Sequence, residues 1–114
     1  MKYSESLKKN SDFKKVYNEG KSTANRHLVL YVRENDLGRN RVGISVSKKV
    51  GNSVVRHRLC RLIREGYRLQ EELFRIGYDM VFIVRINAKD CTYKQIEGAI
   101  YQLAKNRHIL KEEK

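Results

Sequence analysis

The chain lacks proline and tryptophan, and its 114 residues include only two cysteines and seven glycines. Two cysteines cannot build a disulfide framework, and without a CxxC motif they fall short of the ligand set of a structural zinc site. No apolar run approaches the roughly 20 residues that a membrane-spanning helix needs. These absences are typical of a single domain that spans residues 1–114 and is held together by an ordinary hydrophobic core.

An apolar segment is also missing from the start of the chain, MKYSESLKKNSDF, so we expect neither a secretory signal nor a membrane anchor. Helical periodicity leaves Cys60 partly exposed, and an exposed free thiol is typical of a reducing compartment. We therefore expect a cytoplasmic protein. A membrane-surface role fits less well, because the apolar positions around Val55 and Leu62 lack an interfacial tryptophan or phenylalanine.

Acidic residues are absent between Asp36 and Glu65, although the chain carries 13 of them. Eight cations fall in the same interval: Arg39, Arg41, Lys48, Lys49, Arg56, Arg58, Arg61 and Arg64. They supply eight of the formal net charge of +12. A solvated helix surface usually mixes both signs, whereas a concentration of one sign indicates a surface for a polyanion. This segment therefore predicts contact with a nucleic acid.

The second half of that interval has helical periodicity, and Gly51-Asn52-Ser53 is typical of a turn and cap before it. At about 100° per residue, one stripe holds the positions that we expect to be buried: Val55, Leu59, Leu62, Ile63, Gly66 and Leu69. The opposite face holds the cations: His57, Arg61, Arg64 and Arg68, with Arg56 and Arg58 on the two shoulders. One helix would thus bury an apolar edge and present its arginines to a partner.

Strands are predicted on both sides of this helix. Residues 28–33 and 41–47 alternate, and turn residues between them predict a hairpin. Residues 78–86, YDMVFIVRI, form a nearly continuous apolar run that is typical of a central strand covered on both faces. A strand before and a strand after the helix predict a crossover, and hence a parallel strand pair.

Two further helices are expected. Ser11 can cap a short one that ends at Gly20, and a capping box at Thr92 opens the last one. The inward positions of the last helix are predicted to be Ile96, Ala99, Ile100, Leu103 and Ala104. The fold class is therefore α+β: a small mixed β-sheet with helices packed on one face and the basic crossover helix beside an open face.

That open face has an unusual composition. On residues 41–47 the positions opposite the core are small: Gly43, Ser45 and Ser47. Tyr31 shares this face, and the helix that carries Phe13 and Tyr17 would border it. Bases of single-stranded nucleic acid stack on such aromatic rings, which predicts a shallow binding groove. The alternative is that these rings belong to the core, as most aromatic residues on small helices do.

Residues suited to catalysis are not grouped in the sequence. The carboxylates Asp12, Asp36, Asp79 and Asp90 belong to different predicted elements. No GxSxG, Walker-type, HExxH or dinucleotide-binding motif occurs. We therefore expect no catalytic residue on this chain, and any reaction that it supports should be carried out elsewhere, for example by an RNA.

The runs ISVSKKVGNSVVRHRLCRLIRE and NSDFKKVYNEGKSTANRHLVLYV closely resemble the protein subunit of bacterial ribonuclease P, along essentially the whole chain. The resemblance implies an accessory subunit of the ribonucleoprotein endonuclease that removes the 5′ leader of precursor tRNA. Its partners would be the ribonuclease P RNA and precursor tRNA, with no membrane and no obligate protein partner. The RNA would perform the hydrolysis with Mg²⁺, and the protein alone would hold no metal.

The resemblance also assigns residues. The catalytic RNA would be bound by Lys48, Lys49, Asn52, Arg56, His57, Arg58, Arg61, Arg64 and Arg68. The substrate leader would be bound by Phe13, Tyr17, Tyr31, Ser45, Ser47 and Lys49. The implied crossover is left-handed, like that of a ribosomal protein domain and unlike most crossovers.

Two positions depart from the family pattern, which has asparagine where His57 stands and lysine where Cys60 stands. The loss of one cation leaves the set of phosphate contacts open, although the flanking arginines are intact. Two other functions remain as alternatives. One is a ribosomal or other structural RNA-binding protein without a substrate role, and the other is a nuclease that acts without RNA.

Overall fold

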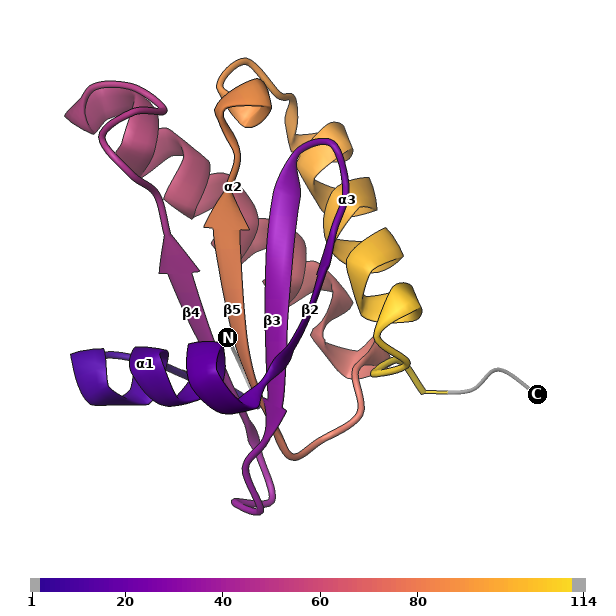
Figure 1. Cartoon of the computed structure of the whole chain (residues 1–114). Helices are drawn as coiled ribbons and strands as arrows, with labels where there is room; N and C mark the ends of the chain where they lie inside the picture. Colours follow the sequence, from indigo (N-terminus) through magenta and orange to yellow (C-terminus); the bar gives the residue numbers. More distant parts are fainter. Residues whose placement is uncertain (1–2, 112–114) are drawn as a thin grey trace.

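The computed structural model describes residues 3–111. Five strands form one mixed sheet in the order β1-β4-β5-β3-β2, and three α-helices pack on it (Figure 1). The elements in chain order are β1 (Ser4–Ser6), α1 (Asn10–Glu19), β2 (Lys21–Ala24), β3 (Leu28–Glu34), β4 (Asn40–Ser45), α2 (Ser53–Gln70), η1 (Glu71–Leu73), β5 (Tyr78–Val84), η2 (Ile86–Ala88) and α3 (Tyr93–Asn106).

Strand β5 occupies the centre of the sheet, as its apolar run predicts. It is parallel to β4 on one side and antiparallel to β3 on the other. The predicted hairpin between residues 28–33 and 41–47 is wrong, because β5 lies between those two strands. A strand that is apolar on both faces gains the most burial in the middle of a sheet, and this gain outweighs the local pairing that the turn residues favour.

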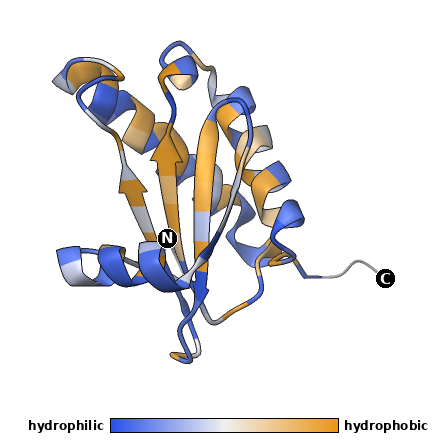
Figure 2. Ribbon diagram, in the orientation of Figure 1, coloured by the Kyte–Doolittle hydropathy of each residue, from blue (hydrophilic) through white to orange (hydrophobic). Residues whose placement is uncertain are grey.

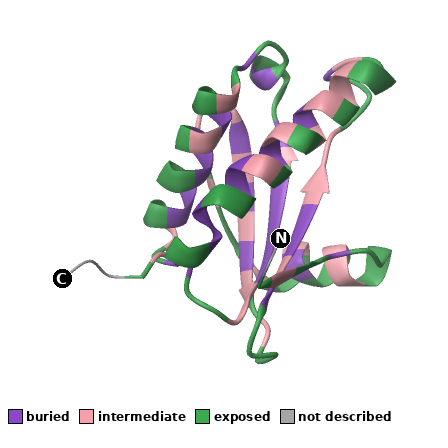
Figure 3. Ribbon diagram, turned by 180° about the vertical axis from the view of Figure 1, so that it is seen from behind, coloured by how far each residue is buried: buried purple, intermediate pink, exposed green. Residues whose placement is uncertain are grey.

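Helix α2 makes the crossover between β4 and β5, and the predicted parallel pair is confirmed. In Figure 1 this helix lies behind the sheet. Seen from its own side in Figure 3, β5 lies to the left of β4 while both strands point upward. The crossover is therefore left-handed, against the usual rule for such connections.

The main core lies between the sheet and the pair α2 and α3, as the hydropathy and burial colours show (Figures 2 and 3). All five inward positions predicted for α3 are buried. On α2, Leu59, Ile63 and Gly66 are buried as predicted. Leu69 is instead 57% exposed, because Tyr67 and Gln70 occupy the inner side of the last turns.

Helix α1 packs on the opposite face of the sheet, so only α2 and α3 share a face. Its Val16 forms a second, smaller core with Leu7 and Val81. Ser11 does not cap this helix, because α1 already begins at Asn10 and its N-cap Lys9 makes no side-chain cap bond. Gly20 ends the helix as predicted, and a Cβ there would lie 2.5 Å from the Val16 carbonyl oxygen.

The two edge strands, β1 and β2, were not predicted. Their sequences, SES and KSTA, are polar and short, and they show no apolar alternation that would indicate a strand. Such short polar edges limit unwanted pairing with other sheets. Within residues 3–111, no helix combines the length and the hydropathy needed to cross a bilayer.

Candidate nucleic-acid interface

The first candidate surface is the outward side of α2. Asn52 caps the helix by accepting a hydrogen bond from the Val55 backbone N–H at 3.0 Å, as predicted. Four side chains that the angular count placed outward are exposed: His57, Arg61, Arg64 and Arg68. Arg56 and Arg58 are half-buried. We call these six residues the basic face.

The charges of the basic face are largely unbalanced. Within the part of the chain that the structure describes, Arg68 is its only arginine paired with a carboxylate, that of Glu65. Arg61 and Arg64 have no such partner there. The Arg56 Nε is buried and has no hydrogen-bond partner among the described residues. Guanidinium groups held side by side on a rigid helix without acids are suited to phosphate groups.

Arg58 has an additional structural role that the sequence did not indicate. Its guanidinium donates hydrogen bonds to the carbonyl oxygens of Lys89, at 3.3 Å, and Cys91, at 2.7 Å. These bonds fix the segment after β5 to α2. Part of the donor capacity of Arg58 is therefore used within the protein, which makes Arg61 and Arg64 the better probes of RNA binding.

Two of the eight cations in residues 37–64 do not belong to this surface. Arg39 pairs with Glu5 at 2.9 Å, and Arg41 pairs with Asp79 at 2.7 Å. Both lie in or next to β4 rather than on α2. Within residues 37–64, the cations that have no carboxylate partner among the described residues thus lie on α2 and in the turn before it.

That turn, residues 47–52, presents the remaining predicted contacts. Ser47, Lys48 and Lys49 are exposed, while Val50 is buried and anchors the turn. The Ser47 hydroxyl accepts a hydrogen bond from the Lys49 backbone N–H at 3.2 Å. Both lysines therefore stand beside the N-terminus of α2, where the helix dipole adds to their positive potential.

The second candidate surface is the sheet face that carries α1. Tyr31, Val81 and Gly43 are neighbours in register across β3, β5 and β4. The Tyr17 ring packs edge-on against Tyr31, with ring centroids 5.1 Å apart. The Phe13 ring lies over Gly43, where a Cβ would come within 2.6 Å of it. The sequence therefore correctly predicted that the helix of Phe13 and Tyr17 borders Tyr31.

Helix α1 crosses only one end of this face (Figure 1). The next row of residues toward the 47–52 turn is Val29, Ile83 and Ser45, and all three are half-buried. Tyr31 is half-buried as well, so it is not sealed beneath α1. We call Phe13, Tyr17, Tyr31, Val29, Ile83 and Ser45 the aromatic face. Leader contact by its predicted members stays a prediction.

Two of the carboxylates meet in space after all, around Arg41. Its guanidinium contacts Asp79 at 2.7 Å and Asp12 at 3.5 Å. Asp79 is 1% exposed, and it also accepts a hydrogen bond from the Asn35 amide at 2.9 Å. Burial opposes ionisation of Asp79, but the bonds from Arg41 and Asn35 outweigh it and lower its pKa. A carboxylate held ionised in this way serves structure, not acid–base chemistry.

Cys91 and His27 form a contact that sequence spacing could not reveal. The Cys91 Sγ lies 3.2 Å from the His27 Nδ1, although 64 residues separate them. Burial raises the pKa of the Cys91 thiol, although Arg26 and Arg58 oppose this shift. Both cysteines are free thiols. Among residues 3–111 no three histidines, cysteines or carboxylates gather as a metal site would require.

The pairing pattern on α2 gives a first testable prediction. Replacing Arg61 with alanine should weaken RNA binding by about 1 kcal/mol, since it removes one unpaired cation from a phosphate contact. Replacing Arg68 should cost less, because its guanidinium is already engaged by the Glu65 carboxylate and is less available to a phosphate. Filter-binding affinities for the two variants test this order, and a larger loss for Arg68→Ala would contradict it.

Three features define the class of this protein: a mixed sheet, a basic face on the crossover helix and an aromatic face on the sheet. Together they are typical of a small basic α+β protein that binds nucleic acid. The family model described as Ribonuclease P matches residues 1–108. The chain therefore belongs to the ribonuclease P protein family.

Relatives and solved structures agree with this assignment. The ribonuclease P protein component of Lachnoclostridium phytofermentans is 53% identical over 107 residues, which cover 94% of this chain and 92% of the relative. That of Clostridioides difficile is 53% identical over 104 residues, 90% of this chain and 91% of the relative. The Staphylococcus aureus ribonuclease P protein superposes with a TM-score of 0.86 at 37% identity, covering 93% of this chain and 97% of its own. The Thermotoga maritima protein gives 0.80 at 28% identity, covering 86% and 93%.

Family membership makes this chain a protein component of ribonuclease P, a nuclease complex of tRNA processing, and implies association with the ribonuclease P RNA. It also bears out the left-handed α+β fold that the sequence resemblance implied. This membership excludes a ribosomal protein, which was part of the first alternative.

Proposed function

We propose that this chain supports removal of the 5′ leader from precursor tRNA by using two surfaces for two RNAs. The basic face binds the catalytic RNA, and the aromatic face holds the single-stranded leader. The hydrolysis takes place on the RNA with Mg²⁺, and the protein contributes affinity and positioning. One observation carries the proposal. The arginines of α2 that have no carboxylate partner among the described residues lie on one side of the sheet, and the half-buried rings around Tyr31 lie on the other.

The chemistry of each surface suits its partner. Guanidinium groups that have no acidic partner can each bind a phosphate group, and phosphate groups lie close together in a folded RNA. Aromatic rings stack on bases of any identity, so the leader should be bound with little sequence preference. The small side chain of Ser45 leaves room for an extended strand across the sheet, beside the Phe13 ring that fills the space above Gly43. Lys49, in the turn at the end of that face, would meet the leader's phosphates.

Mg²⁺ would be held by the RNA in this scheme. Hard divalent cations take oxygen ligands, usually several carboxylates together with water or phosphate. The buried carboxylate Asp79 is committed to Arg41 and Asn35. Asp12 and Asp79 share Arg41, so these two carboxylates are already paired with a cation. This commitment supports assigning the metal to phosphate oxygens of the RNA.

Replacing Tyr31 with alanine should weaken binding of precursor tRNA by the reconstituted complex about five- to thirtyfold, because base stacking contributes about 1–2 kcal/mol. Binding of mature tRNA should not change. Dissociation constants for tRNA with and without a leader provide the measurement. Tyr3→Ala, at a tyrosine that is 53% exposed and lies outside the aromatic face, is the matched control and should leave both constants unchanged. An equal loss for both tRNAs with Tyr31→Ala would rule out leader binding at the aromatic face.

A further inference from the structure

A hollow of about 380 Å³ lies at the C-terminal end of α3, away from both surfaces described above. One wall is α3 itself, which carries Tyr101 and Lys105 one helical turn apart and therefore side by side. The other wall is formed where the chain after α3 runs back along η1. Figure 1 shows this end of α3 far from the 47–52 turn and the first turns of α2.

The second wall is fixed by backbone pairing. The Lys111 N–H donates to the Leu73 carbonyl oxygen at 2.7 Å, and the Arg75 N–H donates to that of Ile109 at 2.8 Å. Phe74 and Ile109 are 1% and 2% exposed, so this pair of segments is anchored in the main core. Hence the side chains around the hollow are held on rigid backbone, as a preformed binding site requires.

The lining combines apolar surface with positive charge. Leu73 and Tyr101 remain 48% and 40% exposed, and Leu110 lies beside them. His108 and three cations form the rest of the lining, the cations being Arg75, Lys105 and Lys111. No carboxylate lines the hollow within the described residues. The complementary ligand has a flat, weakly polar part and a negative charge, which is the chemistry of a nucleotide.

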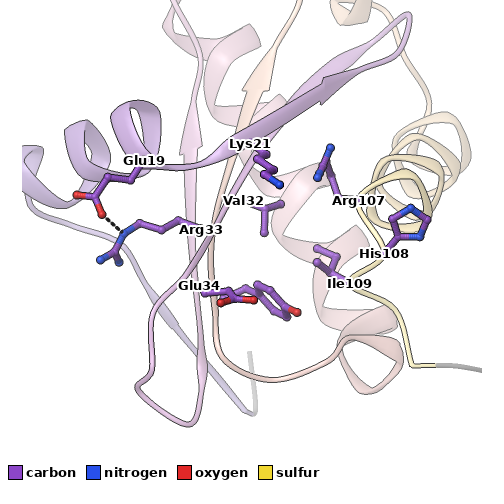
Figure 4. A pocket seen from close by; sticks show the side chains of 9 residues that line it. Glu19, Lys21, Val32, Arg33, Glu34, Arg107, His108 and Ile109 are labelled. Carbon is purple, nitrogen blue, oxygen red and sulfur yellow. Dashed lines mark hydrogen bonds and ion pairs between the residues drawn. The ribbon is translucent and has the colours of Figure 1, made fainter.

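A neighbouring hollow, which His108 also lines, differs from this one in the charges of its lining (Figure 4). It is larger, about 550 Å³, but Glu19 and Glu34 line it together with Lys21 and Arg107. Its Arg33 is bonded to Glu19 at 3.2 Å. Carboxylates in the lining repel a phosphate, so this hollow is poorly suited to a nucleotide even though more space is present.

We propose that the hollow formed by α3, η1 and residues 109–111 binds one nucleotide of a single-stranded RNA segment. Its base stacks on Tyr101 and contacts Leu73, and its phosphate lies between Lys105 and Lys111. This site is independent of leader binding at the aromatic face and of RNA binding by α2. It would give the protein a third point of attachment to RNA, far from the 47–52 turn and the first turns of α2.

The test uses the full-length, ¹⁵N-labelled protein without any RNA subunit. Uridine 5′-monophosphate should shift the amide resonances of Leu73, Tyr101 and Lys105, and Tyr101→Ala should weaken this binding about fivefold or more. Inorganic phosphate at the same concentration should shift Lys105 much less and Leu73 not at all. A response to phosphate as large as that to the nucleotide would show recognition of charge alone and overturn the proposal.

A short oligouridylate tests the phosphate contacts. In a Tyr31→Ala background, which removes stacking at the aromatic face, Lys105→Ala/Lys111→Ala should lower the salt slope of binding by about 0.7, the value for the one phosphate that the two lysines contact. The double variant Lys8→Ala/Lys94→Ala removes the same charge from exposed positions outside the hollow and should leave the slope unchanged. Equal slopes for the two double variants would overturn the proposal. So would shifts by an acidic, phenylalanine-containing peptide that exceed those by the nucleotide, since they would indicate a protein partner.

Discussion

Replacing both Arg61 and Arg64 with alanine should weaken binding of the catalytic RNA about 25- to 60-fold at about 0.1 M salt. Each phosphate contact contributes about 0.7–0.9 to the slope of log affinity against log salt, so losing two contacts lowers the slope by about 1.4–1.8. These two residues are chosen because they are exposed and have no carboxylate partner among the described residues, whereas Arg58 and Arg68 are engaged within the protein.

The slope distinguishes a phosphate contact from a loss of folding. A destabilised protein would lose affinity at every salt concentration by a similar factor, while loss of ion release changes the dependence on salt itself. Lys8→Ala/Lys94→Ala serves as control, since it removes two exposed charges elsewhere. If the slope of the arginine variant equals that of the wild type, the basic face does not bind the RNA.

Replacing Asp79 with asparagine should lower the free energy of unfolding by about 3 kcal/mol at neutral pH. The change leaves the half-buried guanidinium groups of Arg41 and Arg33 without their shared counter-charge. Urea unfolding followed by circular dichroism measures the loss. Asp36→Asn, at an exposed turn position, is the control and should have little effect.

The pH dependence of this loss follows from the direction of the pKa shift. The pKa of Asp79 is lower in the folded protein than in the unfolded chain, so its stabilising effect is fully present above the unfolded pKa, near 3.9. It disappears as the pH falls through the folded pKa. The difference between wild type and Asp79→Asn should therefore be constant from neutral pH to about pH 5 and narrow below about pH 4. A difference that persists at lower pH would show that the carboxylate charge is not what stabilises this site.

Local periodicity was sufficient to predict the basic face. The positions of His57, Arg61 and Arg64 depend only on the angle between successive residues of one helix, and this angle is the same in every α-helix. The caps at Asn52 and Thr92 were predicted for the same reason, since each involves residues no more than three apart. The prediction that Leu69 is buried was wrong, because its angle places it at the edge of the stripe, where the packing of neighbouring residues decides burial.

Non-local features could not be predicted in this way. The order of strands depends on which pairing buries the most apolar surface, and the adjacent turn residues favoured a different pairing. Arg41 and Asp79 are 38 residues apart, and Cys91 and His27 are 64 apart, so no spacing rule connects them. The left-handed crossover came only from the family resemblance, because alternation and composition carry no information about handedness.

The sequence nevertheless predicted which residues border Tyr31. Helical spacing placed Phe13 and Tyr17 on one side of α1, and strand alternation placed Tyr31 opposite the main core. The second core around Val16 and Val81 then brings these rings together. Gly43 explains why α1 can lie so close to the sheet, because any side chain there would meet the Phe13 ring.

The central claim is that two surfaces of this protein bind two different RNAs. Site-directed crosslinking tests it in the assembled complex, with a photoreactive group attached to Ser45→Cys on the aromatic face or to Arg64→Cys on the basic face. Cys60→Ser removes the half-exposed native thiol, and the other native thiol, Cys91, is 3% exposed. We expect Ser45→Cys to crosslink to the leader of precursor tRNA and Arg64→Cys to crosslink to the catalytic RNA. If both positions crosslink to the same RNA, the account is wrong.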